Sequence, residues 1–287
     1  MRDSPAAWTR TDVEVPGPDG ALVLDVWTLG ETGAPHTVLA LHGFPQSARC
    51  WQAAGERLAD HGVRVVAPDQ RGYSPGGRPP GVEHYRMPHL VADVLAVADA
   101  VDAPAFHLLG HDWGAQVGWN VCAEAPERVR SFTAVSVPHP RAYATAYAQD
   151  ADQREAAAYI GIFWQPGTGE EWLAAKDWAV LRHMLTGLPE AEAEHYVARM
   201  REPGVTTAAL SWYRAMESAA DFPSTRVPTT YLWSTGDLAL RRRGAELCGD
   251  FVDADYRSVE LDGVSHWIPD EAPDAVVDAV LDRVARS

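Results

Sequence analysis

Cysteine is scarce in this chain of 287 residues. Its three cysteines, Cys50, Cys122 and Cys248, lie far apart, and their spacing fits neither a disulfide framework nor a metal-binding motif. An odd number of widely separated cysteines is typical of a protein in a reducing compartment. We therefore expect a cytoplasmic protein whose functional site holds no metal.

Positive charge is also in short supply, with 24 Lys and Arg against 40 Asp and Glu and a formal net charge of −16 at pH 7. An acidic surface repels nucleic-acid phosphates and anionic lipid head groups, so we expect neither nucleic acid nor membrane as a partner. Long apolar runs are missing as well, because no stretch approaches the roughly 18–20 continuous apolar residues of a membrane span. The first residues, Met1–Trp8, lack the basic start and apolar run of a secretion leader.

What the sequence does contain is a regular alternation of short apolar runs with longer stretches of helical periodicity. The runs predict strands over 22–28, 37–41, 63–67, 106–109, 131–137, 229–233 and 257–261. A helix is predicted between two of these strands, over 90–101. Strands that alternate with helices predict an α/β fold, with a mostly parallel sheet flanked by helices on both faces.

The alternation stops between Pro138 and Pro223. This stretch is rich in Ala, Trp, Tyr, Arg and Glu, shows helical patterns over 190–200 and 206–218, and has no run of β-branched residues. We therefore predict a core formed by residues 1–137 and 224–287. A helical cap, residues 138–223, is predicted to be inserted after one core strand.

The most informative segment is a Gly-x-Asp-x-Gly turn. A predicted strand leads into Gly110, Asp112 and Gly114, and a helical pattern follows over 115–123. In such a sharp strand–turn–helix connection the central side chain projects above the sheet, and the glycines permit close backbone approach. An Asp in such a pattern can also simply cap a helix. Its place between a buried strand and a helix favours a nucleophile.

A carboxylate nucleophile dictates a particular chemistry. Unlike the serine that usually occupies this turn, Asp112 is already ionised at neutral pH and can displace a leaving group from a saturated carbon directly. The product is an ester between enzyme and substrate. A water molecule deprotonated by a histidine must then hydrolyse that ester, and this step requires an oxyanion hole.

The oxyanion hole can be placed from the same logic. In a turn of this kind one N–H comes from the residue after the nucleophile, here Trp113, and the other from a loop after an earlier strand. The segment His42-Gly43-Phe44 directly follows the predicted strand 37–41. The backbone N–H of Phe44 is therefore the expected second donor.

The histidine and its orienting acid follow from their order along the chain. Among 11 histidines, His266 lies between the last predicted strand and the last helix, and Asp237 follows the preceding strand. The order Asp112, Asp237, His266 is that of nucleophile, acid and histidine on this type of sheet. Asp262 is the rival acid, but its position before Gly263 is typical of a turn.

These motifs together resemble the α/β-hydrolase-fold epoxide hydrolases. The matching segments are His-Gly-Phe-Pro-Gln-Ser (42–47), Pro-Asp-Gln-Arg-Gly-Tyr-Ser (68–74), Gly-His-Asp-Trp-Gly-Ala (110–115) and the Ser-His-Trp around His266. The resemblance implies an α/β-hydrolase fold with an inserted cap and an enzyme without a cofactor. It implies that water and a small apolar epoxide react to give a vicinal diol.

The family also carries two cap tyrosines that hold and protonate the epoxide oxygen. By resemblance of the surrounding segments these are Tyr159 and Tyr213, although aromatic residues in a helical cap often serve only packing. We expect Phe163, Trp164 and Trp212 to form the wall of the substrate pocket.

Two alternatives share the carboxylate nucleophile, and a third has no chemistry. Haloalkane dehalogenases often have Asn or Glu at the position of Phe44, which has no side-chain donor, and fluoroacetate dehalogenases have arginines where Trp113 and Gln116 stand. A non-catalytic binding protein of this fold would be expected to lose Asp112, Asp237 or His266. The sequence does not identify the epoxide and does not distinguish a monomer from a homodimer.

Overall fold

The structure is a computed structural model that describes residues 7–217, 219 and 221–287. Residues 1–6 belong to Met1–Trp8, for which no secretion leader is predicted, and Ser218 and Ala220 belong to the predicted cap. All of these lie outside the described residues.

One eight-stranded sheet forms the centre of the molecule, in the order β1-β2-β4-β3-β5-β6-β7-β8. Among the described strands, β2 pairs antiparallel with β1 and β4 and all other neighbouring strands are parallel, so the predicted, mostly parallel α/β fold is confirmed. The strands are β1 (Thr9–Gly17), β2 (Gly20–Leu29), β3 (Thr37–Leu41), β4 (Arg64–Pro68), β5 (Phe106–His111), β6 (Val129–Val135), β7 (Thr229–Ser234) and β8 (Tyr256–Leu261).

Strand β1 is absent from the sequence prediction, whereas the other seven match it within two residues at each end. β1 is an edge strand that exposes most of its side chains and buries only Val13 and Val15. Its composition is therefore polar. The central strands β5 and β7 bury every residue, as strands covered on both faces do, and their apolar runs are easy to recognise.

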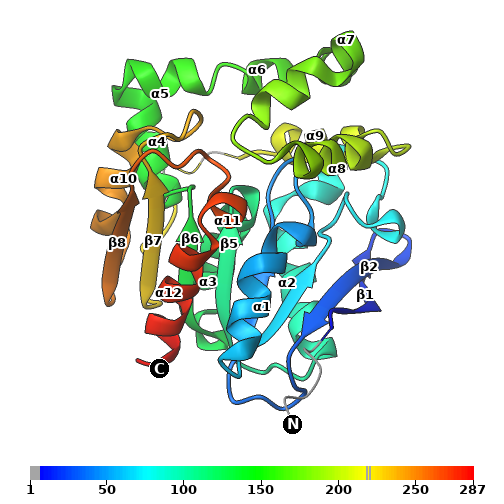
Figure 1. Ribbon diagram of the computed structural model, residues 1–287. Helices are drawn as coiled ribbons and strands as arrows, with labels where there is room; N and C mark the ends of the chain where they lie inside the picture. Colours follow the sequence, from blue (N-terminus) through cyan, green and yellow to red (C-terminus); the bar gives the residue numbers. More distant parts are fainter. Residues whose placement is uncertain (1–6, 218, 220) are drawn as a thin grey trace.

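Helices cover both faces of the sheet (Figure 1). α1 (Gln52–Asp60) and α12 (Pro273–Val284) pack against each other on one face, and α2 (Met87–Ala100) and α3 (Trp113–Glu124) pack together on the other. The short α11 (Ile268–Glu271) precedes α12 and contacts α1. None of the helices in the described part of the chain is long and apolar enough to cross a membrane.

Between β6 and β7, within the predicted cap, the described residues form six helices. They are α4 (Pro140–Gln149), α5 (Ala151–Ala156), α6 (Ile160–Phe163), α7 (Thr168–Met184), α8 (Glu190–Met200) and α9 (Val205–Arg214). α8 coincides with its prediction, whereas α9 ends at Arg214, earlier than predicted. Figure 1 shows α5 to α9 across one end of the sheet, while α4 packs against the core helix α10 (Arg242–Leu247).

Ion pairs join α8 and the loop that follows it to the core. Glu192 accepts two hydrogen bonds from Arg49, at 2.8 and 2.9 Å. Arg199 donates to Asp69 at 3.2 Å, and Arg78 donates to Glu202 at 2.8 Å. This part of the predicted cap is therefore fixed over the carboxyl ends of the central strands.

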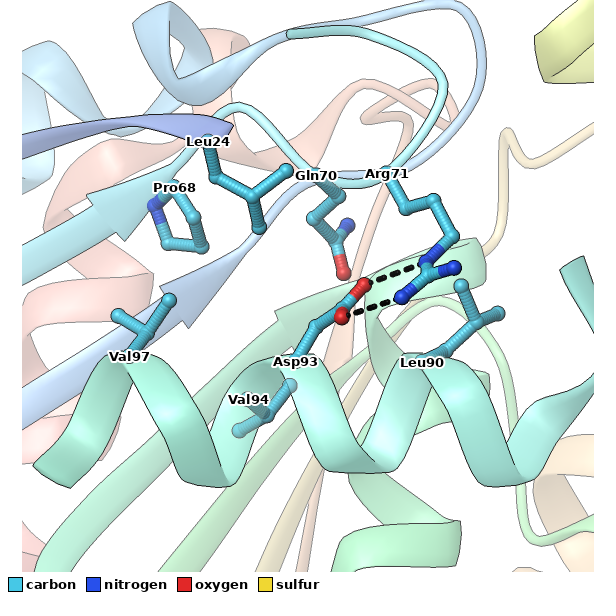
Figure 2. Close-up of a pocket in the computed structure, with 8 residues that line it drawn as sticks. All are labelled: Leu24, Pro68, Gln70, Arg71, Leu90, Asp93, Val94 and Val97. Atoms are coloured by element: carbon cyan, nitrogen blue, oxygen red, sulfur yellow. Dashed lines mark hydrogen bonds and ion pairs between the residues drawn. The ribbon is translucent and has the colours of Figure 1, made fainter. Parts of the chain in front are cut away.

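The motif over 68–74 contributes Arg71 to a buried ion pair in the predicted core. Figure 2 shows that Arg71, in the loop after β4, donates two parallel hydrogen bonds to Asp93 on α2, at 2.8 and 2.7 Å. Arg71 is almost completely buried and also donates to the Pro16 carbonyl at 2.7 Å. The buried charges are thus paired and hydrogen-bonded. The cavity beside them, about 10 Å³, has room for no more than one water molecule.

Candidate active site

Asp112 lies in a strained turn between β5 and α3. Its backbone angles are φ 52° and ψ −121°, a conformation that residues other than glycine seldom adopt. The turn passes so close to the end of β3 that a Cβ on Gly114 would lie 2.0 Å from the Leu41 carbonyl oxygen, and a Cβ on Gly43 would lie 2.4 Å from the Asp112 side chain. Glycine is therefore required at both positions, and the Asp112 carboxylate projects above the sheet.

Backbone N–H groups hold this carboxylate. The Phe44 N–H donates to Oδ1 of Asp112 at 2.8 Å. Burial raises the pKa of Asp112, but the interaction with His266 and its charge, together with the nearby Trp113 N–H, outweigh burial and lower it. The carboxylate is therefore ionised at neutral pH. Of the two N–H groups predicted for the oxyanion hole, that of Phe44 donates to Oδ1 of Asp112 and that of Trp113 lies close to the same carboxylate.

His266 lies between two carboxylates. Its Nε2 is 3.7 Å from Oδ2 of Asp112, and its Nδ1 is 2.7 Å from Oδ2 of Asp237. Asp237 is buried in the loop after β7 and accepts further hydrogen bonds from the Ala239 and Leu240 N–H groups, at 2.8 and 2.9 Å. The structure therefore brings together the three residues of the predicted triad.

The rival acid, Asp262, lies elsewhere. It is exposed and accepts a hydrogen bond from the Thr235 hydroxyl at 2.9 Å. Since the Nδ1 of His266 is already paired with Asp237, the geometry favours Asp237 as the orienting acid.

The two carboxylates also set the charge of His266. Burial lowers the pKa of His266, but the charges and hydrogen bonds of Asp237 and Asp112 outweigh burial and raise it to about 10. Part of this increase depends on the negative charge of Asp112. A reaction that neutralises Asp112 therefore lowers the pKa of His266 and makes the histidine a better base.

A cavity of about 690 Å³ opens above Asp112. Its wall includes both predicted tyrosines, Tyr159 and Tyr213, and two of the predicted wall residues, Trp164 and Trp212. Asp112 and the two tyrosines thus line one cavity. In the described part of the chain no three His, Cys, Asp or Glu side chains are grouped to bind a metal ion.

The tyrosines are fixed by ring packing. The ring of Tyr213 lies edge-on to Phe44 and Trp113, with centroids 5.5 and 5.0 Å apart, and to Tyr159, with centroids 6.4 Å apart. Burial, with a smaller contribution from the charge of Asp112, raises the pKa of both tyrosines above the ordinary value. Both hydroxyls are therefore protonated at neutral pH.

Phe163 does not line the cavity. It is fully buried and packs behind the two tyrosines, with its ring centroid 5.2 Å from Tyr159, 4.9 Å from Tyr213 and 5.4 Å from Phe44. The expectation of a pocket-wall role is therefore not met. A fully apolar ring contributes more to the free energy of folding when it is buried behind the tyrosines than when it lies in a cavity wall in contact with solvent.

Three residues that the sequence reasoning passed over hold the backbone of His266. Its carbonyl oxygen accepts a hydrogen bond from the Ser136 hydroxyl at 3.2 Å and lies 2.9 Å from Nε2 of His111. His111 in turn lies 2.9 Å from the side chain of Gln46. His111 lies in the matched motif 110–115, next to Asp112, and Gln46 lies in the matched motif 42–47, near Phe44. These positions in the sequence could have indicated that both residues belong to the site.

Known proteins with this architecture can now be compared. The sequence profile of the family described as alpha/beta hydrolase fold matches residues 36–273. The chain belongs to this family. The predicted resemblance to its epoxide hydrolases is confirmed as well.

Three relatives illustrate the likeness of this α/β hydrolase. "Epoxide hydrolase A" of Mycobacterium tuberculosis is 33% identical, with 90% of this chain and 93% of that protein covered. "AB hydrolase superfamily protein YfhM" of Bacillus subtilis is 32% identical, with 91% and 94% covered. The crystal structure of epoxide hydrolase A from Mycobacterium thermoresistibile superimposes with a TM-score of 0.82, at 28% identity, over 97% of this chain and 98% of that one.

Proposed function

We propose that this α/β hydrolase opens epoxides to vicinal diols through a covalent ester on Asp112. The observation that carries the proposal is the arrangement of three side chains in one cavity: the Asp112 carboxylate and the hydroxyls of Tyr159 and Tyr213. Epoxide opening requires a nucleophile on carbon and a proton donor on oxygen at the same time. The names and structures of the relatives support the same reaction.

In the first half-reaction the two tyrosines hold the epoxide oxygen. Oδ1 of Asp112 is occupied by the Phe44 N–H, so Oδ2 is the oxygen free to attack. A bond forms between Oδ2 and an epoxide carbon, the carbon–oxygen bond of the ring breaks, and the ring oxygen takes a proton from a tyrosine. Once the ester has formed, the Asp112 side chain carries no charge.

The charge of Asp112 helps to keep His266 protonated before the reaction, so once the ester has formed His266 passes this proton to the tyrosinate left by ring opening. In the second half-reaction the neutral His266 accepts a proton from water, and the resulting hydroxide attacks the carbonyl carbon of the ester. The N–H groups of Phe44 and Trp113 stabilise the oxyanion that forms on Oδ1. Collapse of this intermediate breaks the Cγ–Oδ2 bond and releases the diol, whose new hydroxyl takes the proton of the regenerated Asp112 carboxyl. Asp112 is then an anion again, and His266 again carries a proton.

The predicted cap, residues 138–223, has a defined part in this proposal. It supplies both tyrosines, on or beside α6 and α9, while the core supplies the triad and the oxyanion hole. The Trp164 indole donates to the Tyr213 carbonyl at 2.9 Å, and Arg214 pairs with Glu170 at 2.8 Å. These contacts tie together the segments that carry the two tyrosines.

The three cysteines, all free and buried, support the proposed cytoplasmic location.

Dehalogenation fits the cavity less well. Halide binding would need a second side-chain donor beside Trp113, and Phe44 has none. The charged side chains among the described wall residues are two carboxylates, Asp112 and Glu217. They repel the carboxylate of a haloacid and favour an uncharged substrate.

The test is single-turnover reaction with an epoxide and a haloalkane, read as diol and halide. We expect diol from the wild type, and a loss of ester formation in the Tyr159→Phe/Tyr213→Phe double variant of roughly 10⁴-fold or more, by analogy with the removal of two oxyanion-hole donors. Circular dichroism checks that the variant is folded. Wild-type rates of ring opening in the double variant, or halide release without diol formation, would sink the proposal.

A further inference from the structure

A chain of buried polar groups runs from the catalytic histidine to Tyr196 on α8. It begins at the carbonyl oxygen of His266, passes through His111 and Gln46, and reaches Asp270 on α11, whose Oδ2 lies 2.6 Å from the amide of Gln46. The other oxygen of Asp270 lies 3.4 Å from the Tyr196 hydroxyl. His111 and Gln46 are almost fully buried and Asp270 is half-buried. Every contact in this chain must therefore have a donor and an acceptor.

The imidazole of His111 constrains where the protons lie. With the Gln46 amide nitrogen toward Asp270, both ring nitrogens of His111 face oxygen atoms, the side-chain oxygen of Gln46 and the carbonyl of His266. Both nitrogens would then need a proton, and His111 would be a cation. Burial, and next the charge of His266, lowers the pKa of His111 to about 3, so a cation is strongly disfavoured.

A half-turn of the Gln46 amide removes the conflict and leaves the positions of its polar atoms almost unchanged. The amide N–H then donates to Nδ1 of a neutral His111, whose Nε2–H donates to the His266 carbonyl. The amide oxygen of Gln46 now faces Asp270 at hydrogen-bond distance. Two acceptors cannot share this contact, so the carboxyl of Asp270 must carry a proton.

We propose that Asp270 is a protonated acid that positions His266 through Gln46 and His111. This role rests on the proposed function, because it serves the histidine that hydrolyses the Asp112 ester. Loss of the proton turns the Gln46 amide back toward the Asp270 carboxylate. Nδ1 of His111 then has to donate, and the lone pair of Nε2 faces the His266 carbonyl, so this carbonyl loses the hydrogen bond from His111 and keeps only the longer one from Ser136.

The surroundings of Asp270 favour the protonated form. Burial, outweighing the hydrogen bond from Gln46, raises its pKa to about 7, and the charges of Glu192 and Glu271 add to the increase. The titratable and charged groups that face Asp270 are Arg49 and Cys50 from the segment after β3, Glu192 and Tyr196 from α8, and Glu271 on its own helix. Those that face His111 are His266, Asp112 and Asp237.

The sign of the linkage to stability follows from the raised pKa. The folded protein holds the Asp270 proton more tightly than the unfolded chain, whose carboxyl has the ordinary pKa of 3.8. The contribution of this proton to the free energy of unfolding is complete below about pH 4. It is lost as the pH rises through about 7.

Asp270→Asn tests the proposal because the amide N–H replaces the carboxylic O–H and cannot titrate. We expect wild-type ester hydrolysis in single turnover to decline above about pH 7, and Asp270→Asn to hydrolyse within about threefold of the wild type at pH 6 without that decline. Asp270→Leu, which removes the donor, should slow hydrolysis roughly tenfold both at pH 6 and above pH 7, compared with the wild type at pH 6. Asp262→Asn, which neutralises an exposed acid away from the chain, is the control and should keep the wild-type profile.

Infrared difference spectroscopy provides a readout that needs no substrate. The wild type at pH 6 should show the carbonyl stretch of a protonated carboxylic acid that is absent from Asp270→Asn. The same decline above pH 7 in Asp270→Asn, or no such band in the wild type, would overturn the proposal. If Asp112 is never alkylated the proposed function fails, while the infrared band still decides whether Asp270 holds the proton.

Discussion

The two sides of the active-site cavity are built by different means. On the core side, backbone N–H groups and a buried acid position the reactive atoms: the Phe44 N–H on Asp112 at 2.8 Å, and Asp237 on His266 at 2.7 Å. On the cap side, Tyr159 and Tyr213 are positioned by aromatic rings packed edge to face. Backbone hydrogen bonds fix an atom closely, whereas ring packing fixes a side chain through its shape.

This difference suggests a division of the chemistry. The core side holds the groups that any reaction with this nucleophile needs, and the cap side holds the groups that suit one kind of leaving oxygen. Substitutions on the two sides should therefore slow different half-reactions. Ester formation should depend on the tyrosines, and ester hydrolysis should depend on the histidine and its acid.

The largest expected effect is that of His266→Gln on the core side. Turnover should fall by roughly 10⁶-fold, the size seen when a hydrolytic triad loses its histidine. Ester formation should continue, because attack by Asp112 needs no base, so an adduct should accumulate. Mass spectrometry should locate it on the peptide that contains Asp112. An adduct on another peptide, or none at saturating epoxide, would contradict the division.

Asp237→Asn should come next, with a loss in ester hydrolysis of roughly 10⁴-fold, because an amide cannot hold the histidine in the required tautomer and charge state. Stopped-flow measurement of the two half-reactions would show the loss in the second only. Asp262→Asn is the matched control and should remain close to wild type. A crippled Asp262→Asn beside an active Asp237→Asn would reverse the assignment of the acid.

On the cap side, Tyr213→Phe should slow ester formation by roughly 10²–10³-fold, since one of two proton donors remains. Ester hydrolysis should be unaffected, which is the opposite of the two core variants. Tyr147→Phe, which removes a hydroxyl from the same cavity wall away from the tyrosine pair, is the control. If Tyr213→Phe slowed hydrolysis and spared ester formation, the two sides would not divide the reaction as proposed.

How much of this arrangement is readable from the sequence also differs between the two sides. The core motifs are constrained by close backbone approach, as at Gly43 and Gly114, where a side chain has no room. Such residues appear at fixed spacing beside Asp112 and Phe44, so the turn and the oxyanion loop can be predicted from the sequence. The polar edge strand β1 gives no such signal.

The cap offers weaker constraints. Many aromatic residues satisfy a packing role, which is why Phe163 was predicted for the pocket wall although it lies behind the tyrosines. The contact of Gln46 with Asp270 joins a loop to α11, 224 residues further along the chain, and no local pattern encodes it. Contacts of this kind depend on how distant segments are arranged in three dimensions.

The smallest expected effect tests the packing behind the tyrosines. Phe163→Leu should lower the free energy of unfolding by about 1–2 kcal/mol, because a fully buried ring becomes smaller. It should also slow ester formation several-fold, because misplaced reacting groups react more slowly. Phe132→Leu, equally buried within β6, is the control: it should destabilise the fold to a similar degree and leave ester formation unchanged. Urea unfolding and single-turnover rates measure both quantities, and equal rates in the two variants would remove the positioning role from Phe163.

The hydrogen bond from Phe44 to Asp112 makes the two oxygens of one carboxylate unequal over the life of the enzyme. In the proposed reaction Oδ1 stays in the N–H pocket, while Oδ2 joins the substrate and departs with the diol. The oxygen of the hydrolytic water then fills the vacant place on Asp112. Each diol thus carries away an oxygen that the protein acquired in the previous turnover, so an enzyme moved into isotopically labelled water releases its first product unlabelled. One oxygen of Asp112 is a reagent that is replaced in every cycle, and the other is a permanent part of the protein.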